Sequence, residues 1–200
     1  MRMRVTIHQL EMTLPSQLVP PHKPHPAYDL VRVAIPCPPL NRFLYTTVGG
    51  DWYWIDRLGW SYAQWQAYLE QETVETWVAY VSGTPAGYFE LDGQPGGSIE
   101  VAFFGLLPQF VGQGLGGSLL SRAVERAWSV GAGRVWVHTC SLDHPNALPG
   151  YQARGFRIFN ILETEQEIPE RPLGPWPGAY PAGVEHGVGV AGMEKHETGA

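Results

Sequence analysis

Four glycines stand close together in the segment LPQFVGQGLGGSLLSRA, residues 107–123. Gly112, Gly114 and Gly117 fit the spacing G-x-G-x-x-G, and Gly116 is the fourth. A strand-like run ends just before them and an amphipathic helical pattern begins just after. Open backbone N–H groups at such a helix start favour phosphate, and glycine lets a ligand approach the backbone closely. The segment therefore predicts a phosphate-binding turn.

The surroundings of this turn argue against a dinucleotide site. The dinucleotide fingerprint follows the first strand of a βαβ unit and is followed by an acidic residue about 20 positions later. Here the turn comes after more than a hundred residues, and Val137, His138 and Thr139 stand at that distance. The Gly-Lys-Ser/Thr sequence of a P-loop is also missing. Two alternatives to a binding site for another phosphorylated cofactor remain at this point. One is an NAD site, which these surroundings disfavour, and the other is a turn that only reverses the chain.

Further residues could carry chemistry. Glu100 lies in a strand-like run between Ile99 and Val101. Because side chains alternate along a strand, Glu100 would face solvent or a site if Ile99 and Val101 face the core. Cys140 could be a nucleophile or a small buried apolar residue, and His138 a residue of a cleft or of the core.

The metal-ligating residue types give a weaker signal. His138, Asp143 and His144 do not have the spacing of ligands on a helix, so no metal site is predicted.

The elements that must position these residues follow from periodicity and turn chemistry. Ser61 is the expected N-cap of a helix, and Gly131 the expected end of the helix after the glycine turn. We expect strands at 3–13, 30–35, 76–81, 86–91, 98–106, 134–140 and 156–162, and helices within 40–71, from 115 to about 129 and at 146–154.

Short turns make the strands at 76–106 an antiparallel meander, and the helical crossover makes 134–140 parallel to 98–106. The predicted fold is therefore α+β, a mixed sheet flanked by helices. Residues 1–168 are read as a single domain. Residues 169–200, rich in Pro and Gly, are read as an irregular tail.

Two segments carry a resemblance to a known family. LLPQFVGQGLGGSLLSRAVERA resembles the acetyl-CoA-binding segment of the GNAT superfamily of N-acetyltransferases, and YQARGF, residues 151–156, resembles its Tyr-x-x-x-Gly-Phe stretch. They lie about forty residues apart with a helix, a strand and a helix between them, as in that family. The resemblance covers about residues 75–162 and implies a GNAT fold with a splayed pair of parallel strands.

The resemblance implies acetyl-CoA as co-substrate, no metal, and direct attack by a primary amine in a ternary complex. Val111 stands where the family has Arg or Gln, so Gln113 or Ser118 could compensate. Either His144 or Asn146 would contact the pantetheine arm. The residues implied for coenzyme A are Phe104, Gly105, Leu106, Val111, Gly112, Gln113, Gly114, Leu115, Gly116, His144 and Asn146.

The resemblance also implies catalytic roles. Glu100 would remove the amine proton, often through water, with Glu90 as a second candidate. Tyr151 would be the general acid, since a phenol with a pKa near 10 is protonated at neutral pH. Trp52, Trp54 and Glu90 are expected to bind the acceptor. The aromatic segment 51–69 would form a wall of the acceptor site and bind a cationic acceptor by cation–π contact. The alternative is that most of these rings belong to the core.

Composition limits the partners. The chain has 200 residues, a formal net charge of −6 and no Lys/Arg-rich run, which argues against nucleic acid and suits a cationic or neutral acceptor. Two distant cysteines, no secretory core and no apolar run of about 18 residues favour a cytoplasmic protein that does not enter a membrane.

The acceptor is then a small-molecule amine or a protein amine, and a homodimer is an option because family members are often dimers. The alternative function is a catalytically silent acyl-CoA-binding sensor or scaffold.

Overall fold

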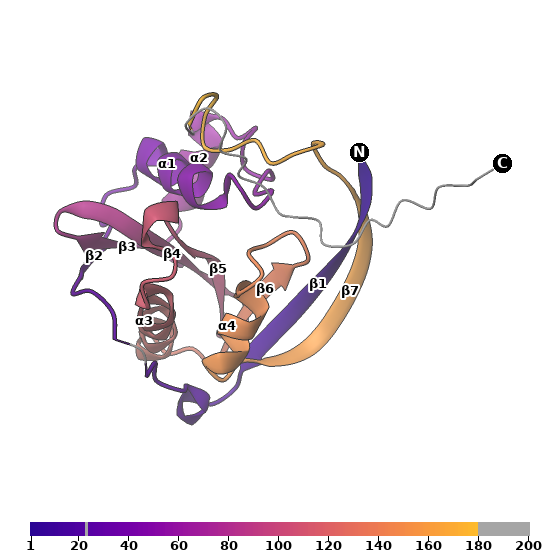
Figure 1. The fold of residues 1–200 in the computed structure, drawn as a ribbon. Helices are drawn as coiled ribbons and strands as arrows, with labels where there is room; N and C mark the ends of the chain where they lie inside the picture. Colours follow the sequence, from indigo (N-terminus) through magenta and orange to yellow (C-terminus); the bar gives the residue numbers. More distant parts are fainter. Residues whose placement is uncertain (23, 180–200) are drawn as a thin grey trace.

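The protein is built on one seven-stranded mixed sheet with helices on both faces (Figure 1). The computed structural model describes residues 1–22 and 24–179. The strands are β1 (Arg2–Met12), β2 (Asp29–Arg32), β3 (Val74–Val81), β4 (Thr84–Gln94), β5 (Ser98–Leu106), β6 (Arg134–Cys140) and β7 (Arg157–Glu167). The helices are α1 (Pro38–Gly49), α2 (Tyr62–Leu69), α3 (Leu115–Ser129) and α4 (Ala147–Ala153), with 3-10 turns η1 (Pro15–Gln17) and η2 (Pro108–Phe110).

The strand order is β2-β3-β4-β5-β6-β1-β7. Strands β3, β4 and β5 form the expected antiparallel meander, and β5 pairs with β6 in parallel, joined by α3. β1 lies between β6 and β7 and is antiparallel to both. The predicted α+β class and the parallel pair are confirmed.

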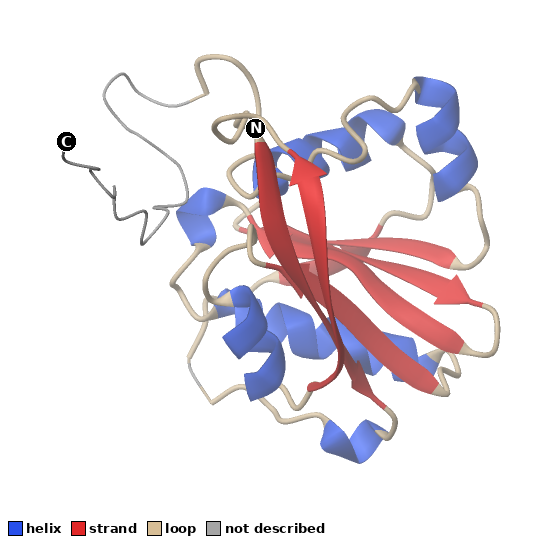
Figure 2. Ribbon diagram, turned by 90° about the vertical axis from the view of Figure 1, so that its right-hand side faces the viewer, coloured by secondary structure: helices blue, strands red, loops and turns tan. Residues whose placement is uncertain are grey.

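The two faces of the sheet carry different cores. On one face α3 packs with Leu119 and Val124 among side chains that include Phe89 and Val101. On the other face α1 and α2 pack around Leu44, Val78, Tyr88, Tyr45 and Trp65. Figure 2 shows helices above and below the strands. Strand alternation therefore decides which β5 side chains meet α3 and which meet α1 and α2.

Most expected elements are present with small shifts of their ends. Ser61 caps α2 as predicted, because its Oγ accepts the N–H of Gln64 at 3.3 Å. The second strand ends at Arg32 rather than residue 35, and the last strand continues to Glu167. Residues 169–179 of the expected tail contain no helix or strand, and 180–200 lie outside the described residues. None of the helices in the described ranges has the length and apolarity to cross a membrane.

Candidate functional site

The glycine turn between η2 and α3 has the backbone that its sequence predicts. Gly112 and Gly114 both have positive φ, 86° and 83°, a conformation that other residues adopt at a cost. Gly114 is the N-cap of α3 and provides no side chain to close the helix start. The first N–H groups of α3, from Leu115 onwards, have no acceptor within the helix. Within the described part of the chain, the positive end of this 15-residue helix is therefore not capped by a side chain.

The amides just before α3 are open as well. The Val111 N–H donates to the carbonyl of Pro108 at 3.2 Å. Among residues 1–22 and 24–179, no hydrogen bond uses the backbone N–H of Gly112, Gln113 or Gly114. A run of unpaired N–H groups on a turn can hold an anion such as a diphosphate.

The proline-rich connector between β1 and β2 passes beside this turn. A Cβ built on Gly114 would lie 2.3 Å from the carbonyl oxygen of Pro24, so glycine is needed there for space as well as for φ. Tyr28 is fixed to the first part of α3 by a hydrogen bond of 3.0 Å to Ser118 Oγ. Ser118, one of the two residues expected to compensate for Val111, is therefore engaged with Tyr28.

Arg154 brings a cation to the same helix start. Its Nη1 atom is buried, has no hydrogen-bond partner among the described residues, and lies 3.5 Å from the Cβ position of Gly117. Gln113, the other expected compensating residue, donates its side-chain amide to Gln109 at 2.7 Å. Sequence reasoning missed Arg154 although it lies within the quoted YQARGF, because a position in the motif does not show that the side chain reaches α3.

Strands β5 and β6 separate after a short paired stretch. Their pairing runs from Ser98–Arg134 to Glu100–Trp136, while β5 continues to Leu106 and β6 to Cys140. Phe104, Gly105 and Leu106 pair with β4 on one side and are past the last β6 pair on the other. The backbone groups of this stretch that point towards β6 can therefore bond an extended ligand.

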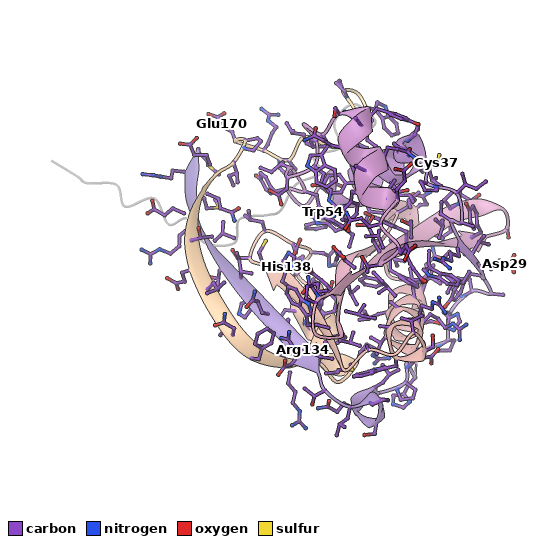
Figure 3. All side chains as sticks on the ribbon, turned by 180° about the vertical axis from the view of Figure 1, so that it is seen from behind. Asp29, Cys37, Trp54, Arg134, His138 and Glu170 are labelled. Atoms are coloured by element: carbon purple, nitrogen blue, oxygen red, sulfur yellow. The ribbon has the colours of Figure 1, made fainter. Side chains whose placement is uncertain are left out.

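Glu100 lies at the point where the two strands separate. Its Oε2 accepts the side-chain amide of Gln94 at 2.9 Å, and its Oε1 is 2.9 Å from His138 Nδ1. The Glu100 side chain is 12% exposed and that of His138 is 50% exposed. His138 lies on β6 (Figure 3). The hydrogen bond thus joins a carboxylate held by Gln94 to an imidazole that solvent can reach.

Tyr151 is buried against the end of the separated strands. Its ring packs edge-on to Phe104 and Phe156, with centroids 6.2 and 6.0 Å away. Burial raises the pKa of the Tyr151 phenol well above its ordinary value, and the nearby Asp143 carboxylate raises it further. The phenol therefore keeps its proton at neutral pH and can offer it as a hydrogen bond to a developing anion.

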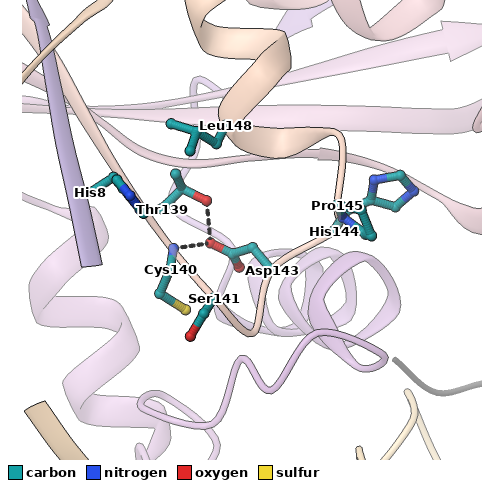
Figure 4. A pocket seen from close by; sticks show the side chains of 8 residues that line it. All are labelled: His8, Thr139, Cys140, Ser141, Asp143, His144, Pro145 and Leu148. Carbon is teal, nitrogen blue, oxygen red and sulfur yellow. Dashed lines mark hydrogen bonds between the residues drawn. The ribbon is translucent and has the colours of Figure 1, made fainter. Parts of the chain in front are cut away.

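The loop after β6 is held by Asp143. Its carboxylate accepts the Thr139 hydroxyl at 2.7 Å and the Cys140 N–H at 2.9 Å, beside a cavity of about 170 Å³ (Figure 4). Burial, with a further contribution from Asp143, raises the pKa of Cys140 to about 11. A thiol is a weak nucleophile when so little of it is ionised, so these surroundings do not favour a covalent route through Cys140.

The two candidates for the pantetheine contact differ in their surroundings. His144 Nδ1 accepts the backbone N–H of Asn146 at 3.0 Å, and the His144 ring lies edge-on to Trp52 at 4.7 Å. Asn146 is the N-cap of α4, but its exposed side chain makes no capping bond. The Asn146 amide is the freer of the two groups to bind a ligand.

Glu90 lies in a buried polar network. Its carboxylate accepts Arg57 Nη1 at 2.8 Å, the Tyr68 hydroxyl at 2.9 Å and the Asn41 amide at 3.3 Å. Sequence reasoning offered Glu90 for binding the acceptor or as a second base. With its side chain 2% exposed, the carboxylate is committed to partners inside the protein.

Most aromatic rings of segment 51–69 belong to the hydrophobic core, and several of them surround the guanidinium of Arg57. The Arg57 guanidinium lies within 4.0 to 5.6 Å of the ring centroids of Trp60, Trp65, Tyr68 and Phe103. Trp54 donates to Asp143 at 3.3 Å, and Trp52 contacts His144, so both lie beside the loop after β6. They remain available as a wall, whereas the cation–π positions around Arg57 are filled.

A family model described as the acetyltransferase (GNAT) family matches residues 41–156. Similar solved structures include a GCN5-related N-acetyltransferase from Kribbella flavida, with 20% identity, a TM-score of 0.58 and coverage of 82% of this chain and 58% of that one. Another, from Sphaerobacter thermophilus, has 17% identity, a TM-score of 0.55 and coverage of 80% and 51%.

An aminoglycoside acetyltransferase, meta-AAC0020, from an uncultured soil metagenomic sample in complex with trehalose, has 16% identity, a TM-score of 0.53 and coverage of 64% and 86%. The match covers between 50% and 63% of the length of the first five solved structures. A search of curated proteins found no match. At these identities the solved structures support the fold.

Proposed function

This chain belongs to the GNAT family of acetyltransferases, and from that premise we propose that it moves the acetyl group of acetyl-CoA to a primary amine by direct attack in a ternary complex. The observation that carries the proposal is the combination of open amides at Gly112–Gly114 with the separation of β5 and β6. The first suits a diphosphate, and the second suits an extended arm with amide groups.

The residues present fit coenzyme A. The N–H groups from Gly112 to Gly116 would bind the diphosphate, and the Arg154 guanidinium would supply the positive charge that Val111 lacks. The backbone of Phe104–Leu106 and the side chain of Asn146 would hold the pantetheine arm. Acetyl-CoA, when bound, supplies a thioester with a transferable acetyl group.

Side chains where β5 and β6 separate would take the proton from the amine and supply one to the departing sulfur. A base at the strand separation, where Glu100 lies beside His138, would take a proton from the amine, which must be neutral to attack. Tyr151 holds its proton in the folded protein and would give it to the departing sulfur. The Tyr151 ring is fixed by Phe104 and Phe156, so its hydroxyl has little freedom to turn away.

The acceptor would enter from the side of Trp52 and Trp54. Carboxylates of Asp56 and Asp143 act on this region, and the net charge of −6 adds to their attraction for a cationic amine. Small-molecule amines and protein amines both meet these requirements. The aminoglycoside acetyltransferase of similar fold makes polycationic small molecules a reasonable first panel.

The experiment combines binding and turnover. Calorimetry should show saturable binding of coenzyme A, and a thiol assay should show coenzyme A release from acetyl-CoA that depends on an added amine. Binding without amine-dependent release across small amines and peptides would favour the silent module. A thermal shift with NAD but none with coenzyme A would refute the assignment of the glycine turn.

A further inference from the structure

Both oxygens of the Glu100 carboxylate have partners inside the protein. Oε2 accepts Gln94 Nε2 at 2.9 Å, and Gln94 is itself held because its Oε1 accepts Trp136 Nε1 at 3.2 Å. Oε1 faces His138 Nδ1 at 2.9 Å. The Glu100 side chain is only 12% exposed, so little of this carboxylate is open to an incoming amine. The chain Trp136–Gln94–Glu100–His138 instead fixes the carboxylate with one side turned to the imidazole.

His138 is the exposed end of this chain. It lies on β6 two residues beyond Trp136, the last residue paired with β5, and its side chain is 50% exposed. A carboxylate can only accept, so in the neutral imidazole the proton sits on Nδ1 and the lone pair on Nε2. Nε2 has no hydrogen-bond partner within the described part of the chain. It is the basic atom of the pair that an incoming amine can meet.

We propose that His138 Nε2 accepts the proton of the acceptor amine, and that Glu100 is a positioning residue that acts through His138. The proposal rests on the proposed function. The proton passes from the ammonium nitrogen to Nε2, the electron pair stays on nitrogen, and His138 later returns the proton to water. His138 is then the catalytic residue of this step, and Glu100 selects its tautomer and stabilises its charged form.

The charges around His138 support this role. The carboxylates of Glu100 on β5, Asp143 after β6 and Asp56 between α1 and α2 all act on the imidazole. From β1, the residue opposite His138 is Gln9, which is uncharged. The hydrogen bond to Glu100 is the main cause that raises the pKa of His138 above its ordinary value, while burial opposes it. A raised pKa makes the imidazole a stronger base, and turnover should increase as pH rises through it.

The first test needs no activity. The titration of His138 is followed by NMR in ligand-free protein, with His138→Gln used to identify its signal. Glu100→Gln should lower the pKa of His138, because the carboxylate that stabilises the imidazolium becomes a neutral amide. The other histidine signals in the same spectrum serve as the control. An unchanged His138 titration would mean that Glu100 does not act through the imidazole, and would overturn the proposal.

The second test is the pH profile of turnover with the best amine of the panel. His138→Gln should lower kcat by about 10²-fold with coenzyme A affinity unchanged, the low end for general base help. Glu100→Gln should move the acidic limb to lower pH and keep substantial activity above it. Activity lost at all pH in Glu100→Gln but kept in His138→Gln would make Glu100 the direct base. If wild-type protein binds no coenzyme A and turns over no amine, the proposed function fails, whereas the NMR result stands independently.

Discussion

Arg57 donates to Glu90 at 2.8 Å in a place where the two side chains are only 10% and 2% exposed. Arg57 comes from the loop between α1 and α2, and Glu90 from the middle of β4. Tyr68 of α2 donates to Glu90 and, at 3.4 Å, to Asp92. The α1–α2 region, which forms the acceptor side of the proposed site, is therefore anchored to the sheet by a buried ion pair.

Removing one member of the Arg57–Glu90 pair should destabilise the folded protein. We expect Arg57→Met to lower the free energy of unfolding by about 3–5 kcal/mol, because it leaves a buried carboxylate without its counter-charge. Chemical denaturation measures the change. Arg122→Met is the control, since Arg122 pairs with Glu125 at the surface and such pairs contribute less than about 1 kcal/mol. Equal small losses in both variants would mean that Glu90 is readily solvated or protonated.

Gly116 allows a charge to be placed at the proposed diphosphate site without disturbing the fold. It is the second residue of α3 and its φ is not positive. Of the residues that the structure describes, Leu106 alone would contact a Cβ there, at an ordinary 3.6 Å. We expect Gly116→Asp to weaken coenzyme A binding by about tenfold or more through repulsion, while the helix dipole stabilises the added carboxylate. Calorimetry and thermal melting measure the two effects. Gly116→Asn is the neutral control, and equal affinities of the Asp and Asn variants would count against a diphosphate at this turn.

Arg154 should contribute its charge to the same site. Replacing Arg154 by Met keeps much of the apolar stem but removes the cation, and we expect coenzyme A affinity to fall by roughly tenfold. Arg157→Met makes the same change three residues later, on an exposed position of β7. Comparable affinities in the two variants, measured by calorimetry, would show that the buried Nη1 of Arg154 does not meet the ligand.

The elements around the turn could be predicted from sequence because their signals are local. The helix after Gly114 shows its period within 15 residues, and Gly114 itself marks its start. The position of β1 could not be predicted, since its pairing with β6 joins Ile7 to Cys140, and no short-range pattern reports such a contact. The order of the elements along the chain could therefore be predicted from sequence, whereas the position of β1 between β6 and β7 came from the structure.

Some candidate site residues could likewise be found from local motifs, whereas contacts between residues distant in sequence could not. Tyr151 and the glycines were found from motifs, but the bond between Glu100 and His138 links residues 38 positions apart. Arg57 is buried, which is seldom the case for an arginine without a counter-charge. That counter-charge is Glu90, which the sequence offered for the acceptor, and only tertiary packing reveals that the two residues meet.

Glu75 should make the fold sensitive to acid. Its carboxylate accepts two bonds from Arg126, at 2.7 and 2.8 Å, and one from Trp77 at 2.8 Å. The bonds from Arg126 are the main cause that lowers the pKa of Glu75. A lowered pKa in the folded state means stability that is present above the unfolded-state pKa and is lost as pH falls through the folded-state pKa.

We expect Glu75→Gln to cost about 1–3 kcal/mol at neutral pH and less as the pH falls. Urea denaturation at a series of pH values measures the difference from wild type. Glu125→Gln, at an exposed pair on α3, is the matched control. A difference that stays constant down to the acid transition would contradict the assignment of this linkage to Glu75.

Tyr151→Phe tests the proposed proton donor most directly. Phenylalanine keeps the ring contacts with Phe104 and Phe156, so the variant should fold and bind coenzyme A as wild type does. Turnover should fall by about 10²-fold because the leaving sulfur loses its proton source. Since burial raises the pKa of Tyr151, its own ionisation should not limit turnover in mildly alkaline solution, and any alkaline limb in that range should persist in Tyr151→Phe. Unchanged kcat in a folded variant that binds coenzyme A would remove the phenol from the reaction and leave Tyr151 as a packing residue beneath the separated strands.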